Sequence, residues 1–222
     1  MSFSQEWDQI YKTGGHKSVW PWSDLVSLTH RYLKGDGKGK KVLELGCGAG
    51  ANIPFFLSLG MDYYGIEGSE YQAEILNKQY KDMGVQIKAC DFTKEIPLED
   101  NFDFIVDRGS VTCNSTADIK NMLDEVYRKI SEEGYFIGVD WFADSHDAFR
   151  QADADTDYLD AYTCIFHRGY FSGLGAIHFF TEGQIRSLFR NFKIMELTEK
   201  KIIQHISEKT TCASWNFVAR KC

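Results

Sequence analysis

The stretch of sequence that decides the fold is Val42-Leu43-Glu44-Leu45-Gly46-Cys47-Gly48-Ala49-Gly50. Its first four residues form a mostly apolar run that predicts a buried strand. The glycines that follow permit a sharp turn and let the backbone approach a ligand closely. We expect a helix over 51–59, with Pro54 in its first turn and free N–H groups at its start. The spacing also matches GxGxxA, so this stretch alone equally predicts a dinucleotide site.

Strand-like and helical runs alternate after this stretch. Four further apolar runs are expected to form strands: 63–66, 85–89, 102–106 and 135–139. Segments with helical periodicity or capping residues lie between or after them: 69–80, 119–130 and 181–189. Two consecutive strand-like runs, 194–197 and 213–219, predict an antiparallel hairpin at the sheet edge. The fold expected is therefore α/β, doubly wound and Rossmann-like, with a mostly parallel seven-stranded sheet.

Two segments fall outside this alternation. Residues 1–34 show helical periodicity and predict an N-terminal helical arm, in which Trp20-Pro21-Trp22 belongs either to the packed arm or to a substrate wall. Residues 141–180 are rich in Asp, Tyr, Phe and His. They follow the fifth strand at the carboxyl edge of the sheet, where ligands bind in such folds, so we expect a substrate-side insertion. The length of the chain predicts one domain spanning 1–222.

Composition restricts the partners and the compartment. The formal net charge is −7 and the densest basic cluster, 34–41, reads as a glycine-rich loop, so we expect a small-molecule partner and no nucleic acid. No run of 18 apolar residues occurs, which predicts no membrane span. The six cysteines show no CxxC pair, and no signal peptide is recognised. These features predict reduced thiols in a cytoplasmic protein and leave the oligomeric state open.

Three acids around the glycine stretch distinguish between possible ligands. Glu44 lies two residues before Gly46, where its carboxylate would repel the phosphates of a dinucleotide but not a ligand bearing ammonium and sulfonium groups. Glu67 ends the second strand and can accept two hydrogen bonds from a ribose diol. Asp91 follows the third strand and can accept from an adenine amino group while Phe92 packs on the base.

With these residues the sequence resembles the class I S-adenosylmethionine-dependent methyltransferases over roughly residues 40–140. The resemblance implies S-adenosylmethionine as cofactor, with the glycine loop on its methionine portion, the acid after strand two on its ribose and the acid after strand three on its adenine. Together with the arm and the insertion, it implies methyl transfer to an oxygen or nitrogen of a small polar acceptor such as a sugar or an amine. The cofactor-binding residues expected are Glu44, Gly46, Cys47, Gly48, Gly50, Asn52, Glu67, Gly68, Asp91, Phe92 and Asp107.

A general base would be needed only if the acceptor is a hydroxyl. The candidate histidines are His16, His146, His167 and His178, of which His146 and His178 rank first because they lie in the insertion. The residues expected to act in catalysis are His146, His178 and Asp107.

A metal ion would be the alternative to these bases. Asp107 and Asp140 end neighbouring strands and resemble the Mg²⁺ pair of the catechol-type branch, but Trp141 stands where that branch has Asn. We therefore expect no metal. Two rival functions remain open from the sequence: an NAD(P)-dependent reductase, and a cofactor-binding domain without catalysis.

Overall fold

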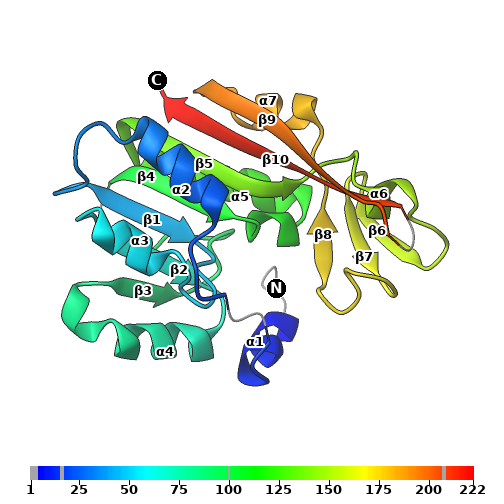
Figure 1. The fold of residues 1–222 in the computed structure, drawn as a ribbon, viewed down its shortest axis with the longest axis horizontal. Coiled ribbons are helices and arrows are strands. Elements are labelled where there is room, and N and C mark those ends of the chain that lie inside the picture. Colours follow the sequence, from blue (N-terminus) through cyan, green and yellow to red (C-terminus); the bar gives the residue numbers. More distant parts are fainter. Residues whose placement is uncertain (1–4, 16–17, 100, 207–208) are drawn as a thin grey trace.

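The computed structural model describes residues 5–15, 18–99, 101–206 and 209–222. Its main element is a seven-stranded sheet with the order β3-β2-β1-β4-β5-β10-β9 (Figure 1). The first five strands in that order run parallel, whereas β10 runs antiparallel to both β5 and β9. The bounds are β1 Lys41–Leu45, β2 Asp62–Glu67, β3 Gln86–Ala89, β4 Phe102–Arg108, β5 Ile130–Phe142, β9 Phe192–Gln204 and β10 Thr210–Lys221. The predicted doubly wound fold with a C-terminal hairpin is confirmed.

Helices cover both faces of this sheet (Figure 1). On one face, α2 (Ser23–Tyr32), α3 (Ile53–Ser58) and α4 (Glu70–Gln79) share a hydrophobic core with the sheet. On the other face, α5 (Thr116–Lys129) and α7 (Glu182–Leu188) do the same. Short 3₁₀ turns occupy Lys81–Met83 (η1) and Val111–Cys113 (η2). The strands β1, β2 and β4 are therefore buried on both faces, which explains their largely apolar sequences, whereas the edge strand β3 is mostly exposed.

Capping residues set the start of the helices, as the sequence predicts. The Ser69 hydroxyl accepts a hydrogen bond from the backbone N–H of Gln72 at the start of α4. Thr181 and Gln184 form a reciprocal capping box at the start of α7. Both arrangements satisfy N–H groups that have no partner within the helix.

The predicted insertion contains a second sheet. Because β5 continues to Phe142, the chain leaves the main sheet only after that residue. It then forms α6 (Asp147–Arg150) and an antiparallel sheet of β6 (Thr156–Asp160), β7 (Thr163–Phe166) and β8 (Ala176–His178). This small sheet has a core of its own, and lies beyond the carboxyl ends of the parallel strands (Figure 1).

The N-terminal arm consists of two helices in different places. Helix α1 (Gln5–Lys12) lies near α4, where the Ser69 hydroxyl donates to Asp8 Oδ1 at 2.5 Å. Helix α2 instead packs Leu25 and Leu28 onto the main sheet. No helix in the part of the chain that the structure describes is long and apolar enough to cross a membrane.

Candidate cofactor and acceptor site

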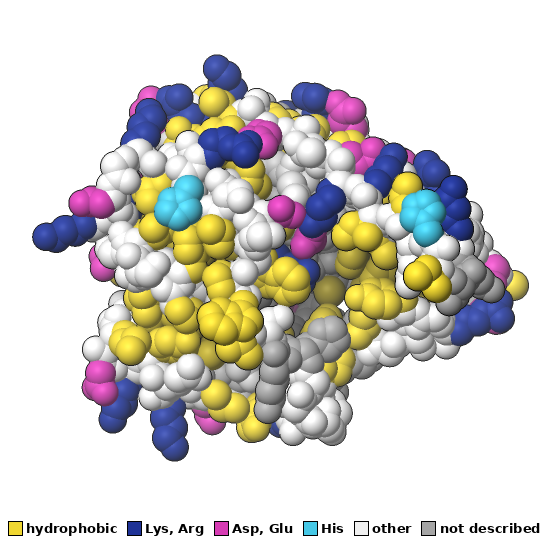
Figure 2. Space-filling model, in the orientation of Figure 1, with side chains coloured by type: hydrophobic (Ala, Val, Ile, Leu, Met, Phe, Trp, Pro, Cys, Tyr) yellow, Lys and Arg dark blue, Asp and Glu magenta, His cyan; other side chains and the backbone are white. Residues whose placement is uncertain are grey.

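A cavity of about 290 Å³ opens at the carboxyl ends of the parallel strands. It lies where β1 and β4 are neighbours and the strand order reverses, which is the usual ligand site of such sheets. Figure 2 shows hydrophobic side chains on both sides of a hollow between the main body and the smaller sheet. We call its two ends the loop end and the ring end. The loop end comprises Glu44, Gly46, Cys47, Gly48, Asn52, Glu67, Gly68, Asp91 and Phe92. The ring end comprises Phe142, Tyr170, Phe171, Leu174 and Ile177.

The glycines of the loop end are required by backbone shape and by space. Gly46 and Gly48 have φ values of 62° and 54°, a region that other residues rarely adopt. A Cβ atom at Gly46 would lie 2.4 Å from the Cβ of Ser110, and one at Gly48 would lie 3.0 Å from the Tyr11 hydroxyl. The loop is therefore packed closely between η2 and the arm.

Glu67 is held by the backbone around it. Its Oε2 accepts a hydrogen bond from Gly48 N at 2.7 Å and its Oε1 accepts one from Ser69 N at 3.0 Å. Burial raises the pKa of the Glu67 carboxyl, and these two donors oppose that effect. The side chain is thus fixed at the cavity wall, with lone pairs left for a ligand.

Glu44 is buried beneath the loop. Its Oε1 accepts from Asn52 Nδ2 at 2.7 Å and its Oε2 accepts from the Tyr63 hydroxyl at 2.5 Å. Burial raises the pKa of Glu44 to about 7. Asn52 Oδ1 in turn accepts from Trp22 N at 3.2 Å, so the same amide connects Glu44 with the arm.

Asp91 and Phe92 complete the loop end on the side of β3. Asp91 Oδ1 accepts from both the N–H and the hydroxyl of Thr93, and Oδ2 lies 3.3 Å from Lys94 Nζ. These contacts fix the carboxylate in a turn directly after the strand. Phe92 is buried and lines the cavity beside it.

Helix α1 covers the loop end. Trp7 and Tyr11 line the cavity, with ring centroids 6.1 Å apart. Burial, reinforced by the charge of Glu67, raises the pKa of the Tyr11 hydroxyl, so this hydroxyl stays protonated. Two aromatic residues of the arm thus form part of the cavity wall, which the sequence did not indicate individually.

Two residues predicted to bind the cofactor do not line the cavity. A Cβ at Gly50 would meet Leu76 and Ile53, so this glycine permits packing of helices rather than ligand contact. Asp107 is fully buried: Ser110 N and Val111 N donate to its Oδ1, and Trp141 Nε1 donates to its Oδ2 at 2.6 Å. Burial raises the pKa of Asp107 to about 6. Its hydrogen bonds hold η2 and Trp141 in place, and the residue expected to act in cofactor binding and catalysis lies outside the cavity lining.

Neither of the two histidines expected to be catalytic, His146 and His178, lines the cavity. His146 caps α6, where its Nδ1 accepts from Ala148 N, and its ring packs among Phe142, Phe171 and Phe179. Burial lowers the pKa of His146.

His178 lies on β8 with its ring against Phe180 and its Nδ1 2.7 Å from the Thr163 hydroxyl. Burial lowers the pKa of His178 to about 4. Because side chains alternate along a strand, Ile177 faces the cavity and His178 does not. His167 pairs with Asp157, and His16 lies outside the described residues.

Asp107 and Asp140 do not form a shared metal site. Asp140 lines the cavity, whereas Asp107 is enclosed under Trp141. Within residues 5–15, 18–99, 101–206 and 209–222, no group of three or more His, Cys, Asp or Glu side chains is arranged to hold a metal.

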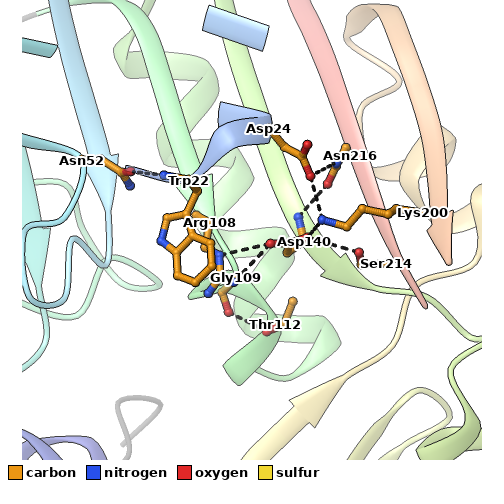
Figure 3. A network of polar contacts seen from close by, with 10 residues as sticks. All are labelled: Trp22, Asp24, Asn52, Arg108, Gly109, Thr112, Asp140, Lys200, Ser214 and Asn216. Carbon is orange, nitrogen blue, oxygen red and sulfur yellow. Dashed lines mark hydrogen bonds and ion pairs between the residues drawn. The ribbon is translucent and has the colours of Figure 1, made fainter. Parts of the chain in front are cut away.

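A polar network that the sequence did not predict surrounds Arg108 and Asp140 at the cavity wall (Figure 3). Arg108, which follows β4's apolar core, donates from Nε to Asp140 Oδ2 at 3.2 Å. The Trp22 ring lies over the guanidinium, 3.3 Å from ring centroid to Cζ. Asp140 Oδ1 accepts from Lys200 Nζ, which also pairs with Asp24 at 2.7 Å. The sequence feature that could have identified Arg108 is its position as a charged residue at the carboxyl end of a strand.

Three acidic side chains of the insertion make contacts away from the cavity. Asp153 and Asp155 both pair with Arg168, and Asp160 accepts hydrogen bonds from Thr116 N and Tyr162 N. None of them lines the cavity. The ring end is consequently more apolar than an acidic insertion predicts.

The charges at the loop end test which cofactor fits. Three carboxylates, those of Glu44, Glu67 and Asp91, line it, and no Lys or Arg of the described chain lines that end. A dinucleotide pyrophosphate would meet these acids without a cation, whereas a nucleoside with ammonium and sulfonium groups would be attracted. The residues present therefore fit S-adenosylmethionine better than NAD(P).

Comparison with known proteins decides the family. The family profile described as a methyltransferase domain matches residues 22–193. The chain belongs to the methyltransferase domain family. The matched region of this methyltransferase domain runs from α2 through α7 and includes every residue of the loop end, whereas α1, which covers that end, lies outside it. The resemblance to class I methyltransferases is confirmed.

One curated relative and several solved structures are similar to this methyltransferase domain. A sterol 4-C-methyltransferase of Caenorhabditis elegans is 26% identical over 166 residues, which cover 73% of this chain and 46% of the relative. The chain thus spans about half the length of that relative.

The structural matches are more distant in sequence. A methyltransferase from Methanosarcina mazei has a TM-score of 0.69 at 18% identity, covering 91% of this chain and 99% of its own. A 1,6-didemethyltoxoflavin-N1-methyltransferase from Burkholderia thailandensis, solved with 1,6-didemethyltoxoflavin and S-adenosylhomocysteine, has a TM-score of 0.65 at 17% identity. That match covers 98% of this chain and 84% of the other. At such identities the structures show a shared fold.

Proposed function

We propose that the protein transfers a methyl group from S-adenosylmethionine to an oxygen or nitrogen of a small molecule. The observation that supports this most is the pairing of the Gly48 N–H with the buried Glu67 carboxylate at the cavity wall, inside the matched methyltransferase domain. Glu67 would hold the ribose, the loop around Gly48 the methionine portion, and Asp91 with Phe92 the adenine. S-adenosylmethionine supplies a methyl group already activated on sulfur, so the protein has mainly to align the acceptor.

Alignment and exclusion of water are tasks that the arm and the ring end can perform. Orientation of two reactants in one site lowers the activation free energy by about 7–11 kcal/mol in favourable cases. Trp7 and Tyr11 cover the loop end, and the ring end presents apolar side chains to the acceptor. Residues 1–34 and the insertion 141–180 thus act, in this proposal, as covers of one domain spanning 1–222.

The nature of the acceptor follows from what lines the ring end. The neighbour from Burkholderia is named as an N1-methyltransferase of 1,6-didemethyltoxoflavin and the relative from Caenorhabditis as a sterol 4-C-methyltransferase, so small-molecule acceptors have precedents and the sterol is one with an apolar body. No histidine of the described chain lines the cavity. An acceptor that needs no deprotonation before it attacks, such as a neutral amine or an ionised hydroxyl, needs no base. A sugar is disfavoured by the apolar walls.

The setting of the protein is part of the proposal. All six cysteines are unpaired in the structure, which supports a reducing compartment such as the cytoplasm. The net charge of −7 supports a small-molecule partner rather than a nucleic acid.

Calorimetry tests the proposal against its rivals. We expect S-adenosylhomocysteine to bind and NADH not to bind, and a radiolabelled methyl group from S-adenosylmethionine to appear on a member of an acceptor library. Binding of NADH alone would favour a reductase. Binding of S-adenosylhomocysteine with no transfer to any acceptor would favour a non-catalytic cofactor-binding domain.

A further inference from the structure

We infer that Arg108 binds the methyl acceptor and that this acceptor is a small molecule with an anionic oxygen on an apolar body. The inference rests on the proposed methyl transfer and adds the class of acceptor and the residue that selects it. Arg108 is the last residue of β4 and lines the cavity.

The guanidinium of Arg108 is fixed on one edge and one face. Its Nε and Nη2 lie 3.2 and 3.1 Å from Asp140 Oδ2, and the Trp22 ring covers one face at 3.3 Å (Figure 3). No side chain or carbonyl of the described residues accepts from Nη1. An arginine held in this way loses little conformational entropy when its remaining N–H groups bind a planar anion.

The backbone beneath Asp140 is shaped to hold this pair. Between the pairs Trp215–Trp141 and Phe217–Gly138, two residues of β5 face the single residue Asn216 of β10, which is a β-bulge. Asp140 occupies that bulge with a φ of 55°, and its N–H donates to Asn216 Oδ1 at 2.9 Å. Strained backbone of this kind is retained mainly where it positions a functional side chain.

Asp140 serves as the support of Arg108 and is not available to the acceptor. Its Oδ1 accepts from Lys200 Nζ at 2.5 Å and from the Ser214 hydroxyl at 3.3 Å, while Arg108 occupies Oδ2. Lys200 is shared with Asp24 at 2.7 Å. Arg108 and Lys200 balance the charges of Asp140 and Asp24, so what Arg108 offers the cavity is the unoccupied N–H groups of a charged guanidinium.

The rest of the cavity supports an anionic acceptor with an apolar body. Arg108 is the one cationic side chain among the cavity-lining residues of the described chain. Beyond it the walls are the apolar residues of the ring end, which exclude water and strengthen an ionic contact. An oxyanion also needs no general base, which agrees with the absence of histidine from the lining of the described cavity.

The test uses benzoate and its neutral isostere benzamide, each titrated by NMR into protein saturated with S-adenosylhomocysteine. We expect wild type to bind benzoate at least tenfold more tightly than benzamide, because a charge-assisted hydrogen bond to a guanidinium is lost with the amide. Arg108→Gln should remove this preference and leave affinity for S-adenosylhomocysteine unchanged. Arg186→Gln, on the exposed side of α7, is the matched control and should behave as wild type.

Arg108→Lys keeps a folded, charged site if the glutamine variant proves unstable. Because lysine cannot make the forked contact with Asp140, we expect its preference for benzoate to fall severalfold. Equal binding of benzoate and benzamide by wild type, binding of neither, or an undiminished preference in both Arg108 variants would overturn the inference. If S-adenosylhomocysteine still binds when one of these results is obtained, the proposed methyl transfer stands. If the wild-type protein does not bind S-adenosylhomocysteine at all, the proposed methyl transfer is refuted instead.

Discussion

Replacement of Glu67 by glutamine measures what its carboxylate contributes to cofactor binding. In the proposed complex both carboxylate oxygens accept from the ribose diol, and each charge-assisted bond contributes about 1.5–3 kcal/mol. An amide keeps the size of the side chain but removes the charge and one acceptor. We therefore expect Glu67→Gln to weaken S-adenosylhomocysteine binding by about tenfold or more, a loss of at least ~1.4 kcal/mol.

The structure adds a cost in stability that the sequence does not indicate. From the sequence, Glu67 is an acid at a strand end, and its replacement should leave the apo protein as stable as before. In the structure it accepts from Gly48 N and Ser69 N, and an amide nitrogen in its place cannot accept from one of them. A buried N–H left without an acceptor costs about 1–3 kcal/mol. We expect the melting temperature of apo Glu67→Gln to fall accordingly.

Calorimetry and thermal melts in parallel separate the two effects. Affinity is measured well below the melting temperature of the variant, so that loss of folded protein does not enter. Glu74→Gln is the matched control, since Glu74 is an exposed acid of α4. If the protein binds S-adenosylhomocysteine and Glu67→Gln binds it with unchanged affinity, Glu67 does not hold the ribose and the reasoning is wrong.

Three further predictions follow from the same site. Because the pKa of Glu44 in the folded state is about 7, the folded state keeps a proton that the unfolded state loses above pH ~4.5. The free energy of unfolding in urea should therefore fall as pH rises from about 5 to 7, and Glu44→Gln should flatten that slope. Gly48→Val should abolish S-adenosylhomocysteine binding in calorimetry, since Gly48 has a φ of 54° and a Cβ there would crowd Tyr11. Normal binding by a folded variant would show that this loop does not bind the cofactor. Amide exchange in α1 and in residues 143–180 should slow when S-adenosylhomocysteine binds, and equal exchange with and without ligand would contradict their role as covers.

The sequence predicts the main sheet well because its signals are local. The apolar run before Gly46 and the caps at Ser69 and Thr181 each depend on residues within a few positions. The strands β6, β7 and β8 were not predicted, since they have only 5, 4 and 3 residues and gain stability from pairing with one another. Non-local pairing of such short strands leaves little periodicity to detect.

The loop end could be predicted because its residues follow consecutive parallel strands, whose carboxyl ends meet at one edge. The direction of a side chain could not be predicted in the same way. A position within the insertion does not tell whether His178 or Ile177 faces the cavity, and the pairing register of β8 decides this. The turn of Asp140 toward Arg108 depends on a bulge against β10, a strand that lies 70 or more residues later in the sequence.

Buried acids with a raised pKa are commonly taken to mark functional sites, and this structure shows which further observation is needed. Burial raises the pKa of Glu44, Glu67 and Asp107 alike. All three have donors on both carboxylate oxygens, but Glu44 and Glu67 line the cavity, whereas Asp107 does not line it and has no exposure. The desolvation that shifts the pKa is the same for a structural acid and for a binding one. What separates them is whether the carboxylate borders the cavity, and Glu67 meets that condition while Asp107 does not.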